Sequence, residues 1–136
     1  MFGTYILLIE LKKDQKIKIG SLGEINFRKG YYCYIGSAFG KPINIENRIS
    51  RHLRKNKKLK WHIDYFLNNK YAKIVDVLVF ENRKIECFLA KILSKKFKPI
   101  KKFGSSDCKC ISHFYYCDEK QIKNIFKKLN FVSFHK

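Results

Sequence analysis

The sequence lacks any long apolar run. Apolar residues make up 46% of its 136 residues, yet no stretch approaches the roughly 20 residues that a membrane-spanning helix needs. A basic leader followed by an apolar segment is also absent from the N-terminus, so we expect no export signal. The chain shows no internal repeat and no low-complexity linker. We therefore expect no membrane association and a cytoplasmic location, where its five cysteines stay reduced or bind metal.

Acidic residues are scarce. Eleven Asp and Glu stand against 30 Lys and Arg, which gives a formal net charge of +19. Such a field attracts polyanions, and release of counterions from phosphates converts the charge into affinity. The charge predicts nucleic acid as the partner, with DNA first and RNA as the alternative. A lysine-rich surface without a partner is the competing explanation.

The length and the hydrophobic patterning predict one domain of the α/β class, of the α+β type. A chain of 136 residues has the size of a single core, so we expect one domain over 1–136, with a core at about 1–100 and a C-terminal extension at about 101–136. Three antiparallel strands over 4–11, 16–19 and 31–35 form the expected sheet. Helices are expected at about 44–55, 61–67, 84–97 and 121–129, and further strands at 72–80 and 111–117.

Two tyrosines stand beside glycines in the first and third expected strands. Gly3-Thr4-Tyr5 and Tyr34-Ile35-Gly36 would lie side by side in an antiparallel sheet. Three further residues follow in order on the expected helices, namely Arg48, His52 and Glu86. Each three-residue motif alone is a weak signal, whereas the ordered set is much more specific.

This order resembles the GIY-YIG nuclease superfamily, and within it the small stand-alone branch called Uri-type endonucleases. Thr4 replaces the isoleucine of the first motif, at a position that points away from the face of its neighbours. Local features that carry the same resemblance are Gly36-Ser37-Ala38, Arg51-His52, Trp61-His62-Ile63-Asp64-Tyr65, Glu86-Cys87 and Phe103-Gly104-Ser105-Ser106-Asp107-Cys108. The resemblance implies a small GIY-YIG-like antiparallel sheet flanked by helices, with a strand and a helix added at the C-terminus.

The resemblance also implies metal-dependent hydrolysis of DNA, in repair or in cleavage of particular DNA structures. Glu86 would hold Mg²⁺ or Mn²⁺, and Arg48 would clamp a phosphate oxygen in a bidentate manner. One tyrosine would act as base, with Tyr34 preferred over Tyr5, while His52 would relay a proton or bind phosphate. A protein partner would supply specificity, because the superfamily often borrows it from another module.

Basic and polar residues near this set complete the predicted site. The expected nucleic-acid-binding residues are Arg51, Arg54, Lys55, Lys57, Lys58 and Lys60. The expected wall of the site consists of Trp61, His62, Asp64, Ser105 and Asp107. An asparagine that many members carry after the third helix is missing here. The rival hypothesis is therefore a module of the same fold that binds nucleic acid without cleaving it.

Cysteines and a histidine gather near the C-terminus. The segment Cys108-x-Cys110-x2-His113-x3-Cys117 offers four soft ligands, with Cys87 as a fifth candidate. Four such ligands suit structural zinc, although the spacings match no common zinc finger. A zinc-stabilised interaction domain is the third hypothesis, and buried thiols that pack the last strand are its alternative.

Overall fold

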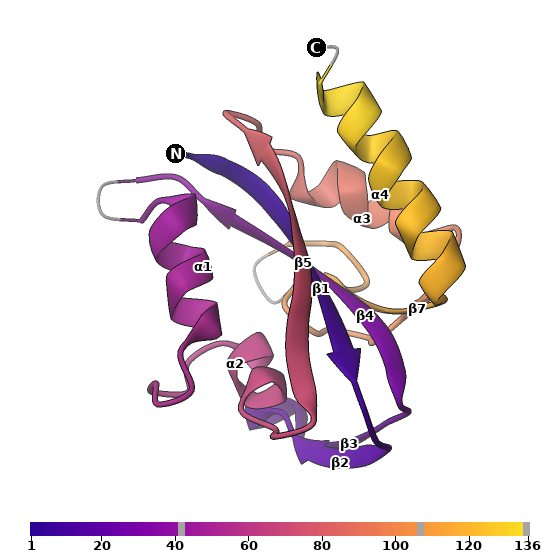
Figure 1. Ribbon diagram of the computed structural model, residues 1–136. Helices are drawn as coiled ribbons and strands as arrows, with labels where there is room; N and C mark the ends of the chain where they lie inside the picture. Colours follow the sequence, from indigo (N-terminus) through magenta and orange to yellow (C-terminus); the bar gives the residue numbers. More distant parts are fainter. Residues whose placement is uncertain (41–42, 106–107, 135–136) are drawn as a thin grey trace.

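The computed structural model describes residues 1–40, 43–105 and 108–134. Over these residues the chain is α+β: an antiparallel five-stranded sheet of order β5-β1-β4-β7-β6, a separate β2-β3 hairpin and four α-helices (Figure 1). The strands are β1 (Gly3–Leu11), β2 (Gln15–Lys18), β3 (Glu24–Phe27), β4 (Gly30–Ala38), β5 (Ala72–Glu81), β6 (Lys98–Pro99) and β7 (Phe114–Cys117). The helices are α1 (Ile45–Leu53), α2 (His62–Leu67), α3 (Glu86–Ser94) and α4 (Glu119–Phe134). Within the described ranges, no helix is both long enough and apolar enough to cross a membrane.

Strand β1 lies at the centre of the fold. It pairs with β4 on one side and with β5 on the other, and eight of its nine residues are buried. A strand covered on both faces must be apolar along its whole length, as this one nearly is. Its register with β4 places Tyr5 opposite Gly36 and Leu7 opposite Tyr34. The predicted pairing of the two glycine–tyrosine motifs is thus confirmed.

The prediction of a three-stranded sheet is wrong in two respects: the sheet has five strands over the described residues, and it does not include β2. The expected strand at 16–19 corresponds to β2, which pairs with β3 in its own two-stranded sheet. Strand β5 takes the free edge of β1, and β7 takes that of β4. Strand β5 is long and rich in β-branched residues, whereas β2 has four residues and buries only one of them. The longer strand therefore gains more by pairing with the central strand.

Alternate residues of β1 enter two cores on opposite faces of the sheet. Tyr5, Leu7 and Ile9 pack with α1, α2 and an aromatic group around Phe114. Ile6 and Leu8 pack with α3 and α4 on the other face. This alternation follows from the two-residue period of a strand. It assigns the side chains of neighbouring residues to opposite faces.

Phe114 on β7 is the centre of the aromatic group. It is fully buried, and ring centroids of Phe103 and Phe66 lie 4.2 and 4.9 Å away. We expect Phe114→Ala to lower the free energy of unfolding by about 3–5 kcal/mol, because it removes burial and leaves a cavity. Phe88→Ala, which truncates a 57% exposed ring on α3, should change it by less than about 0.5 kcal/mol. Urea unfolding checks both, and equal losses would contradict the packing described.

Candidate functional site

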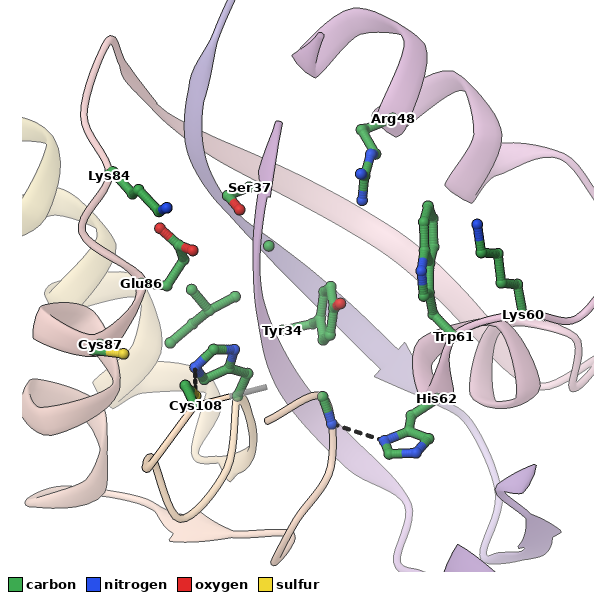
Figure 2. Close-up of a pocket in the computed structure, with 14 residues that line it drawn as sticks. Tyr34, Ser37, Arg48, Lys60, Trp61, His62, Lys84, Glu86, Cys87 and Cys108 are labelled. Atoms are coloured by element: carbon green, nitrogen blue, oxygen red, sulfur yellow. Dashed lines mark hydrogen bonds between the residues drawn. The ribbon is translucent and has the colours of Figure 1, made fainter. Parts of the chain in front are cut away.

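A pocket of about 520 Å³ opens beside the second motif strand. Figure 2 shows Tyr34 between Glu86 on one side and Arg48 with Trp61 on the other. These residues come from β4, α1, the segment before α2, and α3. The structure therefore brings three of the five predicted catalytic residues into one pocket. The other lining residues are Ile35, Gly36, Ser37, Lys60, His62, Lys84, Cys87, Gly104, Cys108 and His113.

Tyr5 and His52, the other two predicted catalytic residues, are buried and do not line the pocket. The Tyr5 hydroxyl is hydrogen bonded to Nε2 of His52 at 2.7 Å. The Tyr5 ring crosses the neighbouring strand at Gly36, where a Cβ atom would come within 2.5 Å of Tyr5 Cζ. Only glycine leaves room for this crossing. The glycine of the second motif thus lets the tyrosine of the first reach α1.

Burial sets the protonation of this pair. Burial, with the nearby charge of Lys57, lowers the pKa of His52 to about 4. Burial and the neighbouring Tyr34 raise the pKa of Tyr5, against an opposing effect of Arg48. Both side chains are therefore neutral at pH 7. In the described part of the chain, His52 Nδ1 is buried without a hydrogen-bond partner.

Trp61 organises the cationic side of the pocket. The guanidinium carbons of Arg48 and Arg51 lie 4.3 and 4.2 Å from its ring centroid, within the range of cation–π attraction. Arg51 also donates to both carboxylate oxygens of Asp64, at 2.8 and 2.9 Å. The backbone N–H groups of Lys60 and Trp61 donate to the same carboxylate. Burial opposes ionisation of Asp64, but these donors lower its pKa below its ordinary value.

Asp64 consequently acts inside the fold and does not form the pocket wall. It is fully buried and fixes the start of α2 to α1 through Arg51. A sequence shows only a carboxylate near several cations, and nothing in it tells an internal ion pair from a site residue.

Glu86 begins α3 and is supported by Thr4. The Thr4 hydroxyl donates to the carbonyl of Arg83 at 2.6 Å and accepts from the N–H of Ile85 at 3.1 Å. It lies 3.4 Å from Glu86 Oε1. Thr4 is fully buried, so the hydroxyl satisfies backbone groups at the start of this helix. The motif pattern predicts Thr4 only as a tolerated replacement for isoleucine; its hydroxyl is the one feature of the sequence that signals this role at the start of α3.

Some of the predicted nucleic-acid-binding residues form bonds within the fold, and the others are exposed at the surface. Lys57 Nζ donates to the carbonyls of Arg51 and His52, at 3.1 and 2.7 Å, so it caps the end of α1. Burial lowers its pKa. Lys60 lines the pocket. The exposed members are Arg54, Lys55, Lys58 and Lys60.

The remaining predicted wall residues lie in different places. His62 lines the pocket, and its Nδ1 accepts from the N–H of Gly104 at 2.9 Å. Ser105 is buried and does not line the pocket, and Asp107 lies outside the described residues. Ser37 and Lys84 line the pocket but were missed. In the sequence, only their positions indicate a role: Ser37 directly follows the second motif, and Lys84 precedes Glu86 by two positions.

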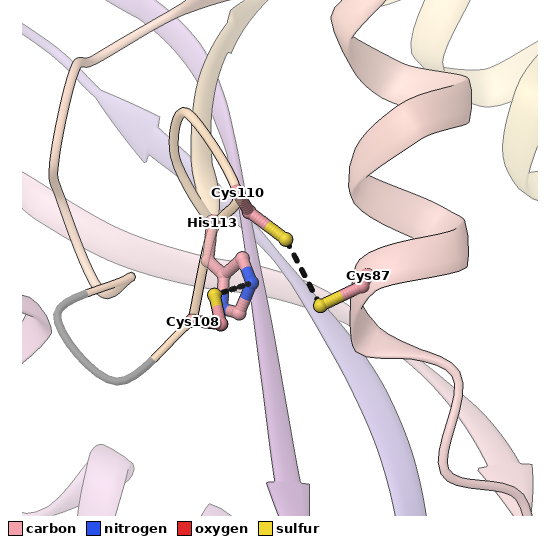
Figure 3. A group of neighbouring side chains, drawn as sticks. All are labelled: Cys87, Cys108, Cys110 and His113. Carbon is pink, nitrogen blue, oxygen red and sulfur yellow. Dashed lines mark hydrogen bonds between the residues drawn. The ribbon is translucent and has the colours of Figure 1, made fainter.

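The cysteines form two groups. Cys117, predicted as a metal ligand, instead faces Cys33 in the core with 3.1 Å between their sulfur atoms. Figure 3 shows the other group, which consists of Cys87, Cys108, Cys110 and His113. Their ligand atoms all lie within 4.8 Å of one another.

The fold and pocket define an α+β protein with a cationic, tyrosine-containing pocket beside strand β4. Residues 4–132 match the family described as "Domain of unknown function DUF123". The match spans nearly the whole chain, and the protein belongs to this family. No curated protein and no solved structure matches the chain.

The lowered pKa of His52 predicts a specific loss of stability in acid. Unfolded histidine titrates near 6.5, and native His52 at about 4, so the unfolded chain binds more protons between these values. Stability from this residue is complete above pH 6.5 and decreases as the pH falls toward 4. Between pH 7 and 4.5 the loss is about 2 kcal/mol.

The His52→Gln variant checks this pH dependence, because glutamine does not titrate. The free energy of unfolding of the wild type should fall by about 2 kcal/mol more than that of the variant between pH 7 and 4.5. The carboxylates titrate in both proteins and cancel in the comparison. Equal pH dependence in urea unfolding would show that His52 is not held neutral by burial.

Proposed function

We propose that this protein is a metal-dependent endonuclease of the GIY-YIG type that hydrolyses phosphodiester bonds in DNA. The observation that carries the proposal is the meeting of Tyr34, Arg48 and Glu86 in one pocket, from elements far apart in the sequence. The antiparallel pairing of the two motif strands beside α1 supports a GIY-YIG-like fold. The net charge of +19 supports a polyanionic substrate.

Arg48 is suited to hold a phosphate. Its guanidinium is planar and permanently charged, and it binds two oxygens of a phosphate at once. Contact with the Trp61 ring restricts the guanidinium plane before substrate binds. Lys60 and Lys84 add positive charge around the same pocket. Charge that develops on a phosphate in the transition state would therefore meet donors already in position.

Glu86 is suited to hold a divalent metal. Its carboxylate is partly exposed, lines the pocket and offers the oxygen ligands that Mg²⁺ and Mn²⁺ prefer. The Thr4 hydroxyl fixes the start of the helix that carries this carboxylate. When bound there, the metal would supply neutralisation of phosphate charge and activation of water. The nearby thiols are soft ligands and are poorly matched to the same ions.

Tyr34 is the better candidate for the base. It lines the pocket, whereas Tyr5 is buried, has a raised pKa and is bonded to His52. His52 is 3% exposed and neutral, so it does not attract phosphate by charge. In the proposed mechanism Tyr34 acts in its phenolate form, which the positive charge of Arg48 in the same pocket and a bound metal would favour. The phenolate accepts a proton from the attacking water, and the Tyr5–His52 pair positions β4 and α1 around it.

Cleavage of supercoiled and branched DNA with Mg²⁺ or Mn²⁺ tests the proposal. Glu86→Gln and Arg48→Ala should each reduce the cleavage rate by roughly 100-fold or more, because each removes charge stabilisation in the transition state. Arg48→Lys should restore little, since an ammonium cannot bind two oxygens in a plane. Glu24→Gln and Arg28→Ala change the same charges at exposed positions away from the pocket and should cleave like the wild type.

The same variants separate cleavage from binding alone. If the wild type cleaves no DNA with either metal, while binding that weakens with salt survives Glu86→Gln, the protein is a nucleic-acid-binding module. Wild-type cleavage that Glu86→Gln and Arg48→Ala both retain would remove the proposed site.

A further inference from the structure

Four side chains outside the proposed catalytic set point toward one another. Cys87 lies on the first turn of α3, Cys108 and Cys110 lie in the loop before β7, and His113 directly precedes β7 (Figure 3). Their ligand atoms all lie within 4.8 Å of one another. The Sγ atoms of Cys87 and Cys110 are 3.0 Å apart, and Cys108 Sγ lies 3.5 Å from His113 Nε2.

These separations fit the corners of one small tetrahedron. Zinc bonds of about 2.3 Å to sulfur and about 2.0 Å to nitrogen place ligand atoms ~3.5–3.8 Å apart in tetrahedral geometry. The Cys108–His113 distance of 3.5 Å matches the sulfur–nitrogen end of this range, and the Cys87–Cys110 distance of 3.0 Å is shorter than the sulfur–sulfur end. The limit of 4.8 Å for all pairs leaves only a small rearrangement around an ion. Ligands of a multi-iron cluster lie further apart because several metal atoms separate them. The cluster therefore has the size of a site for a single ion.

The chemistry of the ligands selects the ion. Three thiolates and one imidazole are soft and borderline donors, which favour zinc over magnesium or calcium. Four protein ligands complete the coordination of tetrahedral zinc, whereas catalytic zinc keeps a position open for water. Three thiolates and Zn²⁺ sum to a net charge of −1, which the strongly positive chain favours. The site therefore suits a structural ion.

The ion would connect two parts of the pocket wall. The loop that carries Gly104 is closed at its base by hydrogen bonds from Lys102 N to Ile111 O and from His113 N to Phe103 O, both 2.8 Å. On the other side, Cys87 follows Glu86 on α3. A bond through one ion would fix this loop to the helix that begins with Glu86.

We propose that Cys87, Cys108, Cys110 and His113 bind one structural zinc ion that fastens the loop before β7 to the start of α3. This site replaces the set expected from spacing alone, because Cys117 faces Cys33 in the core and Cys87 takes its place. It does not rest on the proposed nuclease activity. Zinc binding is measured without DNA, so either proposal can fail while the other stands.

Metal content of the full-length protein tests the site. Protein produced with zinc and purified under reducing conditions without chelator should contain one zinc per chain by elemental analysis. Cys87→Ser and Cys108→Ser should each weaken zinc binding by ~100-fold or more, because each removes a direct ligand. Cys117→Ala and Cys33→Ala remove buried thiols outside the cluster and should keep one zinc per chain.

Cobalt substitution tests the ligands without a mutation, which matters if a cysteine variant fails to fold. Co²⁺ in the wild-type protein should give thiolate-to-metal charge-transfer bands and the intense visible bands of tetrahedral coordination, and zinc should displace both. Native mass spectrometry distinguishes bound zinc from a Cys87–Cys110 disulfide. A disulfide in reduced preparations, iron with sulfide, absence of zinc after reconstitution, or zinc lost only in Cys117→Ala would overturn the proposal.

Discussion

The crossing of the Tyr5 ring over Gly36 is the contact on which the rest of the site depends. Paired strands normally keep large side chains on each face at a fixed spacing. Here the absence of a side chain at Gly36 lets an aromatic ring from β1 pass across β4 and bond to His52 on α1. Helix α1 is thereby held against the sheet at the position that points Arg48 into the pocket. The two motifs therefore depend on each other structurally, because the glycine of one makes room for the tyrosine of the other.

Charge in this protein has internal as well as external roles. Arg51 and Lys57 belong to a basic segment, yet they bond to Asp64 and to the carbonyls that end α1. Their charges hold α1, Trp61 and α2 in place, and they leave Arg48 and Lys60 at the pocket. A basic segment thus supplies both the support of the pocket and its attraction for anions.

Local features of the fold could be predicted because they depend on neighbouring residues. Asn44 caps α1 by accepting from Asn47 N–H at 2.8 Å, and the alternation of β1 follows from its own residues. The sheet order could not be predicted, because β5 and β7 reach β1 and β4 from distant segments. The same limit affected the cysteines: Cys117 is close to Cys110 in sequence, but β7 directs it to Cys33. Cys87 is 21 positions before Cys108 in the sequence, and only the packing of α3 brings them together.

The opposite orientations of Thr4 and Tyr5 on β1 limit the changes of sequence that the pocket can accept. They are consecutive residues, so the pleat of β1 sends one to α3 beside Glu86 and the other to α1 beside His52. One strand therefore sets the positions of both walls of the pocket. Inserting or deleting a single residue near the start of β1 would exchange its faces and displace both walls together. Substitutions can alter the walls one at a time, whereas changes of length in this strand cannot.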